Sequence, residues 1–179
     1  MTPASGHGAE TIFPPLDTAA LAGALLGRNL PPLAEVALRQ AGLAYQSDAE
    51  AERYLFEAKA HAPGHPAVLI GFYRYYFYKH RLEDALVIAR LCLLKAARDN
   101  ALDPDWRRVE PEDAEFGSYD SVLPRFYLFT LKAYAYLQLR LGDLEEGHDA
   151  ALKTLALDPT DKVGASVLLD VLARGRDDD

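Results

Sequence analysis

The chain has 179 residues, of which 50% are hydrophobic and 26% charged, a composition typical of one globular domain with a sizeable core. Lys and Arg number 19 against 27 Asp and Glu, and the formal charge of −8 argues against nucleic acid or an anionic membrane as partner. There are 29 Leu and 29 Ala but only 3 Ile and 8 Val. Because straight-chain residues lose little rotamer freedom in a helix, this composition predicts an all-α fold.

The number of cysteines and the most apolar stretch of the sequence indicate in which cellular compartment the protein is expected. Cys92 is the only cysteine, which excludes an intramolecular disulfide and a cysteine-based zinc site and is typical of a reducing compartment. The N-terminal residues show no basic, cleavable export signal. Residues 122–141 contain Arg125, Lys132 and Arg140, which makes them too polar for a transmembrane helix. We therefore expect a cytoplasmic protein without a membrane segment.

Hydrophobic periodicity, capping residues and Pro or Gly breaks divide the chain into helices joined by short turns. Residues 1–16 and the acidic tail, residues 176–179, lack periodicity and are expected to be flexible. Ser47 and Glu50 have the spacing of a capping box at the third helix. Residues 17–175 are predicted to form a single domain with helices at 18–26, 31–45, 47–63, 66–79, 82–98, 122–141, 144–157 and 161–174.

An acidic insertion, residues 99–121, interrupts this pattern. It contains two prolines, eight acidic residues and the only tryptophan, Trp106. Loops of this length are commonly functional or mobile. Three interpretations stay open. The insertion is a lid, which could contact the protein's own binding surface and inhibit it; it is a second binding segment with Trp106 as its anchor; or it is a passive, solvated insertion.

An internal repeat connects the helices. Ala51, Leu55, Ala58 and Pro63, moved forward by 34 positions, fall on mostly small residues again, namely Ala85, Ala89, Cys92 and Ala97. A period of about 34 residues is that of tetratricopeptide repeats.

The third unit carries the resemblance to that family most clearly. The run Leu139–Pro159 resembles the Gly-Asp turn, second helix and closing Leu-Asp-Pro of a tetratricopeptide repeat, and Ala135 matches the small residue of the first helix. The resemblance covers roughly residues 32–98 and 122–174, and it implies about three stacked helical hairpins with extra terminal helices. Departures are Tyr73, Gly147 and Thr154, which stand where the family usually has small residues or alanines.

Aromatic residues gather in the first helices of the second and third units. Eleven of the 18 aromatic residues in the chain lie within residues 72–78 and 126–136. In the tetratricopeptide family this helix lines the concave surface, which implies that Leu69, Phe72 and Tyr76 face the core. The residues expected to line a basic, aromatic groove are Ile70, Arg74, Phe77, Tyr78, Lys132, Tyr136 and Arg140.

The chemistry of this groove suits an acidic or carboxylate-terminated peptide, because Arg and Lys form charge-assisted hydrogen bonds and tyrosines provide anchors. The alternative is that the aromatic residues pack in the core and the cations pair with acids of the same chain, including the insertion. Both interpretations stay open at this point.

Catalytic and metal-binding patterns give little support to an enzyme. His61 and His65 are four residues apart, but Pro63 and Gly64 lie between them, so we expect surface histidines and no metal site. Cys92 takes a small-residue packing position and is expected to be a buried thiol. No nucleotide-binding, zinc-protease or nucleophile-elbow motif is present in the sequence, and no cofactor is expected.

The sequence therefore predicts a non-enzymatic interaction module, acting as an adaptor, co-chaperone or assembly factor that binds another protein or an acidic peptide. The oligomeric state is left open. Two alternatives remain: a chaperone similar to those of type III secretion translocators, and a helical domain that binds a small ligand in a closed pocket around Arg74 and Lys132.

Overall fold

The computed structural model describes residues 29–118 and 120–177. Within them the chain is all-α, with helices α2 to α8 and two short 3-10 helices, η1 and η2, and these described residues contain no strand. The predicted helix 18–26, the N-terminal residues 1–16 and the last two residues of the tail lie outside this part. The bounds are α2 (Pro32–Leu43), α3 (Asp48–His61), α4 (Pro66–Tyr78), α5 (Leu82–Asp99), η1 (Trp106–Arg108), η2 (Pro111–Asp113), α6 (Val122–Arg140), α7 (Leu144–Leu157) and α8 (Ser166–Asp177).

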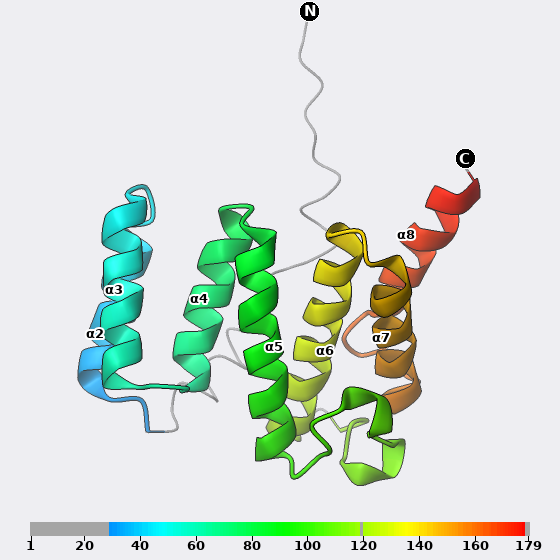
Figure 1. Ribbon diagram of the computed structural model, residues 1–179. Coiled ribbons are helices and arrows are strands. Elements are labelled where there is room, and N and C mark those ends of the chain that lie inside the picture. Colours follow the sequence, from blue (N-terminus) through cyan, green and yellow to red (C-terminus); the bar gives the residue numbers. More distant parts are fainter. Residues whose placement is uncertain (1–28, 119, 178–179) are drawn as a thin grey trace, which may run out of the picture.

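The helices pack as sequential hairpins, α2 with α3, α4 with α5 and α6 with α7, and α8 lies against α7 (Figure 1). Two of the hairpin turns depend on residues in the left-handed region, His80 with φ 56° and Gly142 with φ 93°. Helix α5 also packs closely on α6, which joins the second and third hairpins into one body. The sequence predictions for these six helices are confirmed to within two residues at each end.

Small side chains hold the paired helices together at short range. The buried alanines of α2, α3 and α5 recur mainly at spacings of three, four or seven residues, which places them on one face of each helix, and α6 and α7 contribute two buried alanines each. They are Ala34, Ala37 and Ala41 in α2, Ala51 and Ala58 in α3, Ala85, Ala89, Ala96 and Ala97 in α5, Ala133 and Ala135 in α6, and Ala150 and Ala151 in α7.

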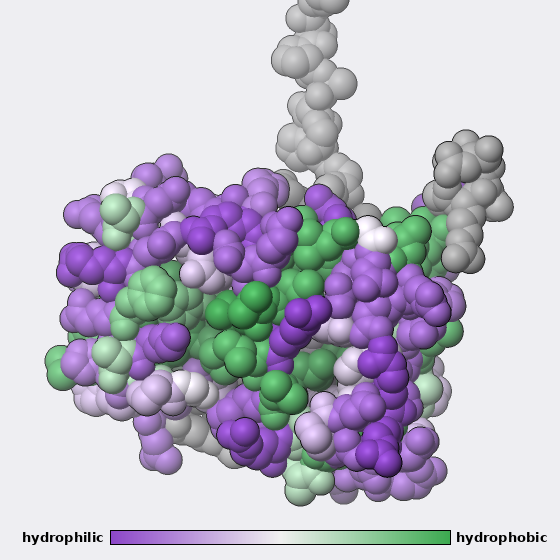
Figure 2. All heavy atoms as spheres, viewed as in Figure 1, coloured by the Kyte–Doolittle hydropathy of each residue, from purple (hydrophilic) through white to green (hydrophobic). Residues whose placement is uncertain are grey.

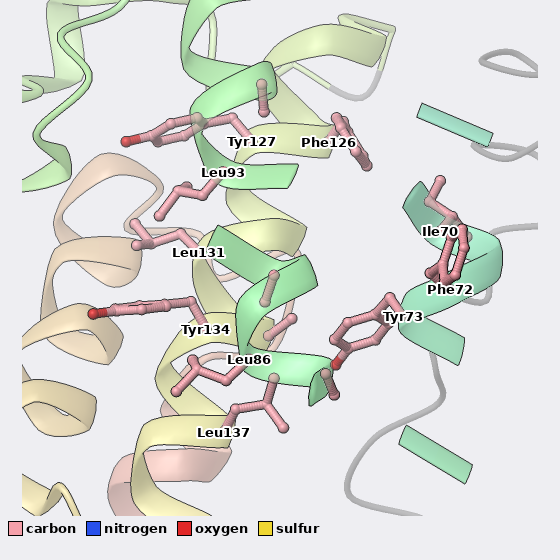
Figure 3. Packing of buried hydrophobic residues seen from close by; sticks show 14 of the residues in the cluster. Ile70, Phe72, Tyr73, Leu86, Leu93, Phe126, Tyr127, Leu131, Tyr134 and Leu137 are labelled. Carbon is pink, nitrogen blue, oxygen red and sulfur yellow. The ribbon is translucent and has the colours of Figure 1, made fainter. Parts of the chain in front are cut away.

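Larger side chains fill the layer between the hairpins (Figure 3). Leu86 and Leu93 of α5 lie against α6. Tyr73 lies within the second hairpin and extends from α4 toward α5. Cys92 is 2% exposed, and burial raises the pKa of its thiol to about 12. The expectation of a buried thiol is thereby confirmed.

The first hairpin is attached more loosely than the others. Helix α3 makes only slight contact with α4, and α2 makes even less contact with α4. Two ion pairs connect the N-terminal end of α3 to the turn after α4, Asp48 with Lys79 at 2.8 Å and Glu52 with Arg81. The Lys79 ammonium lowers the pKa of the Asp48 carboxyl by hydrogen bonding to it.

The acidic insertion is an ordered element packed on α6 and α7. Trp106 is buried with its ring centroid 6.4 Å from that of Tyr134, and the ring of Phe116 is tilted against that of Tyr127 with centroids 5.9 Å apart. The Lys153 Nζ of α7 donates a hydrogen bond of 2.9 Å to a backbone carbonyl of the insertion. These apolar contacts explain why a segment without helical periodicity is nevertheless held in place.

Two local predictions were wrong. The last helix begins at Ser166 and not at residue 161, because Asp161 has φ 52° and its carboxylate accepts hydrogen bonds from the backbone amides of Ala165 and Ser166. The capping box at Ser47 does not form. Ser47 stands at the N-cap, but its hydroxyl makes no cap hydrogen bond, and its backbone carbonyl accepts the first helical bond, from the amide of Ala51.

Among the described residues, no helix combines the length and apolar character that crossing a bilayer requires.

Replacing Ala85 with Leu should lower the free energy of unfolding by about 1 to 3 kcal/mol, because Ala85 is fully buried between paired helices and added methylenes must displace neighbours. Thermal or denaturant unfolding monitored by circular dichroism measures the change. Unchanged stability would contradict the role of small residues at this interface.

Replacing Gly147 with Ala should also destabilise the protein, by about 1 to 3 kcal/mol, although alanine is the better helix former. A Cβ at Gly147 would lie 2.9 Å from the Ala135 carbonyl oxygen, so α6 and α7 would have to separate. Gly42→Ala is the control, since a Cβ there meets nothing within 4 Å and should increase stability by up to about 1 kcal/mol. Similar changes in both variants would argue against close packing at Gly147.

The Cys92 thiol should not react with Ellman's reagent at pH 8 in the folded protein, because it is buried and protonated. After unfolding in guanidinium chloride, one thiol per chain should react. Rapid stoichiometric labelling of the folded protein would show that α5 opens or that Cys92 is accessible.

Candidate functional site

A pocket of about 460 Å³ lies between α2 and α4. Its walls are mainly apolar, with Leu38 from α2, Leu55 from α3 and Ile70 from α4, and Leu30 lies at its edge before α2 begins. We call this the α2–α4 pocket. It lies where the first hairpin makes slight contact with the second, so its volume follows from the loose junction between the two.

Two helical glycines contribute to the hollow. Gly42 of α2 and Gly71 of α4 both line the α2–α4 pocket. A Cβ at Gly42 would meet nothing within 4 Å, whereas one at Gly71 would lie 2.9 Å from the Leu38 Cδ2. The missing side chain at Gly42 therefore leaves open space in the pocket, whereas at Gly71 the ends of Leu38 and Leu55 pack against the glycine.

The charges at the pocket come from α2 and α4. Arg39 and Glu35 pair with each other at 3.2 Å. Arg74 is exposed, and within the described part of the chain it has no ion pair or hydrogen bond of its side chain. Burial raises the pKa of the Tyr75 hydroxyl to about 12, so this side chain adds no charge to the pocket. Arg74 is thus the unneutralised charge in the pocket lining.

A row of aromatic rings leads from the pocket to α6. Tyr78, which lines the pocket and is 43% exposed, contacts Phe77 with ring centroids 5.7 Å apart. Phe77 in turn lies 5.8 Å from Tyr136 of α6. The Tyr136 hydroxyl accepts a hydrogen bond of 2.6 Å from the Arg140 guanidinium, which also lies over the ring at 5.6 Å. We call Arg74, Phe77, Tyr78, Tyr136 and Arg140 the arginine–aromatic surface.

Arg140 is exposed and, among the described residues, has no carboxylate partner. The ion pairs and hydrogen bonds of the insertion's described residues stay within the insertion or go to α5, α6 and α7, and none reaches Arg74 or Arg140. The described contacts therefore show no self-inhibiting pairing of the acidic insertion with these two arginines.

Six of the eight sequence-predicted partner-binding residues belong to this region. Ile70, Arg74 and Tyr78 line the α2–α4 pocket, and Phe77, Tyr136 and Arg140 extend it. Ile70 is only 7% exposed, however, and contributes to the pocket wall rather than to an outer face. Leu69, expected in the core, is partly exposed.

Lys132 and Trp106 lie elsewhere. Lys132 is 7% exposed, and its Nζ donates a hydrogen bond of 2.6 Å to the Val163 carbonyl in the turn before α8. Burial lowers the pKa of its ammonium. Positions eight apart on a helix differ by about 80° in direction, so Lys132 and Arg140 diverge although both flank Tyr136. Trp106, within the insertion, is buried against Tyr134 of α6, and neither Lys132 nor Trp106 exposes its side chain to an outside partner.

A second exposed feature is an apolar stripe on α5. Val87, Leu91 and Leu94 are 55%, 47% and 47% exposed. Figure 2 shows a hydrophobic patch over α5 that hydrophilic side chains surround. Arg90 and Arg98 are exposed on the same helix and make no ion pair within the described ranges.

The described residues do not meet the requirements of a metal-binding site. No group of three or more His, Cys, Asp or Glu side chains among them is placed to hold a metal ion. His61 ends α3, and His65 is the N-cap of α4, where its Nδ1 accepts a hydrogen bond of 3.1 Å from the Ala67 amide. The spacing of these two histidines thus reflects a helix boundary.

The sequence analysis missed the α2 side of the pocket, namely Leu30, Leu38, Gly42 and Tyr45, as well as Gly71 of α4. A signal was present. An isolated glycine within a helical pattern lowers helix stability and usually has a packing or functional reason, and Gly42 and Gly71 both fit that description.

Comparison with known proteins gives one informative relative. No family model matches the chain, and no solved structure matches it significantly. The chain is 41% identical over 128 residues to an uncharacterized 19.8 kDa protein in the nifW 5′ region of Azotobacter chroococcum mcd 1, which covers 71% of this chain and 72% of that protein. At this identity and coverage, the chain belongs to the same family as the Azotobacter protein.

Proposed function

We propose that this chain is a non-enzymatic protein-interaction module, built like a tetratricopeptide array, that binds an acidic segment of another protein on its arginine–aromatic surface. The sequential hairpins and the alanines buried at their interfaces support an array of stacked units. Each unit buries one face against its neighbour, and the first helices α4 and α6 still expose Arg74, Tyr78 and Arg140 to a partner.

One observation carries the proposal: two exposed arginines without carboxylate partners in the described structure are joined by contacting aromatic rings to an apolar pocket. The chain has a net charge of −8, and Arg39, Lys79, Arg81 and Lys95 all have acidic partners. Arg74 and Arg140 have no such partner in the described structure, which is also true of Arg90 and Arg98 on α5, but Arg74 and Arg140 are the two at either end of the arginine–aromatic surface. A partner that supplies carboxylates would satisfy them through charge-assisted hydrogen bonds.

The aromatic rings add a reason to favour a peptide. Tyrosine and phenylalanine provide rigid apolar area, which is typical of residues that dominate binding energy at protein interfaces. The small-ligand alternative called for a closed pocket around both Arg74 and Lys132, and Lys132 does not line the α2–α4 pocket. The arrangement therefore favours an extended partner segment.

The family suggests where to look for the partner. The Azotobacter relative is described by its position in the nifW 5′ region. The nifW product is therefore the first protein to include in a binding assay, beside capture from a lysate of the source organism.

The Arg74→Glu, Arg140→Glu double variant should lose the partner, with affinity reduced at least about tenfold, because two attractive contacts become repulsive. Affinity capture with wild type and double variant as parallel baits measures the loss, and circular dichroism checks that helicity is retained. Lys132 is left unchanged, because a buried glutamate there would test folding and not binding.

The matched control is Arg90→Glu, Arg98→Glu, which makes the same charge change on α5 at two other exposed arginines without ion pairs in the described structure. A partner retained by wild type and control but lost from the Arg74 and Arg140 variant supports the proposal. Equal capture by all three baits, or loss from the control alone, would remove the assignment to the arginine–aromatic surface.

A further inference from the structure

The α2–α4 pocket restricts which amino-acid sequences of the partner segment fit, beyond the requirement for acidic residues. We infer that the pocket takes one aliphatic or aromatic side chain of the segment, about the size of leucine or phenylalanine, while a carboxylate one or two residues away pairs with Arg74. This inference rests on the function proposed above and goes beyond it by defining a sequence pattern.

The pocket wall selects an apolar side chain. Leu38, Leu55 and Ile70 supply hydrocarbon surface, and the nearest carboxylate, Glu35, is already paired with Arg39. A polar side chain placed there would lose hydrogen bonds to water without replacing them, whereas a leucine or phenylalanine would gain from burial. The volume of about 460 Å³ admits such a side chain together with part of the adjoining backbone.

The position of Arg74 sets the spacing of the carboxylate. Arg74 follows Ile70 and Gly71 by four and three residues on α4, so it lies one turn further along the same face. One helical turn rises about 5.4 Å, and an extended peptide advances about 3.3 to 3.6 Å per residue. A side chain that fills the pocket therefore brings the neighbouring one or two residues of the peptide within reach of the guanidinium.

Gly42 provides independent support for a ligand. A glycine within a helix lowers its stability, and such a position is usually explained by close packing, as at Gly147 against Ala135. At Gly42 no atom lies within 4 Å of where a Cβ would be, so packing in the described structure does not require glycine there. A side chain at this position would project into the pocket, which keeps its full width only without one.

The test uses three synthetic peptides that differ at a single position, acetyl-Glu-Glu-Xaa-Asp-Glu-amide with Xaa as Ala, Leu or Phe. Amide chemical-shift titration of the full chain measures affinities even in the millimolar range. The Leu and Phe peptides should bind at least about tenfold more tightly than the Ala peptide, as expected for burying a large apolar side chain. Arg74→Gln should weaken all three.

Two pocket-filling variants probe the same point. Gly42→Leu places a side chain in open space at the pocket lining and should bring the Phe-to-Ala affinity ratio close to one. Gly71→Ala adds a Cβ 2.9 Å from the Leu38 Cδ2 in the pocket wall, so the end of Leu38 must shift and the ratio should fall. Ala60→Leu, an exposed substitution on α3 away from the pocket, is the matched control and should keep the full ratio.

The outcomes separate this inference from the proposed function. Peptides that bind in an Arg74-dependent way but without preference for Leu or Phe would overturn the pocket assignment and leave the acidic-segment function standing. No binding of any peptide would overturn both. Hexanoate binding as tightly as the Phe peptide would overturn the assignment in favour of a small carboxylate. A Leu25→Glu, Leu26→Glu variant that gains affinity for the Phe peptide would overturn it in favour of the chain's own N-terminal residues.

Discussion

Close approach of paired helices through alanine and glycine is the constraint on which the rest of the structure depends. At Gly147 the limit is reached, because even a methyl group would meet the backbone carbonyl of Ala135. Small residues occupy much of the interfaces within hairpins, and many large side chains lie between hairpins or at the surface. Phe77 of α4 contacts Tyr136 of α6 between two hairpins, on the arginine–aromatic surface. Tyr73 is a large residue within a hairpin and extends from α4 toward α5.

Helix positions could be predicted from the sequence because they depend on local chemistry, and the 34-residue offset between Ala51 and Ala85 correctly placed two buried interface residues. Failures occurred where a distant contact decided the outcome. Lys132 faces inward because its Nζ donates a hydrogen bond to the Val163 carbonyl, 31 residues away. At Asp161, by contrast, a local contact was missed, since its carboxylate accepts a hydrogen bond from the amide of Ala165, just before α8. No periodicity within the insertion could show that Phe116 packs on Tyr127.

The candidate site was predicted in part for a similar reason. The α4 and α6 residues of the groove follow from helical spacing and the family resemblance, which together placed Arg74, Tyr78 and Arg140 on exposed faces. The α2 side depends on how the first hairpin sits on the second, a packing angle that no local pattern encodes. Gly42 and Gly71 were the available clue, since each lowers helix propensity in a chain that is otherwise rich in strong helix formers.

The junction at the α2–α4 pocket has a mechanical consequence. The chain itself connects the first two hairpins at one end of the helices, and the ion pairs of Asp48 with Lys79 and Glu52 with Arg81 connect them at the other. Surface ion pairs contribute little stability each and weaken as salt screens them. In the described part of the molecule, the α2–α3 hairpin is therefore the segment whose amides should exchange with solvent first. Ionic strength should also set how widely the α2–α4 pocket opens, independently of any charge that a ligand carries.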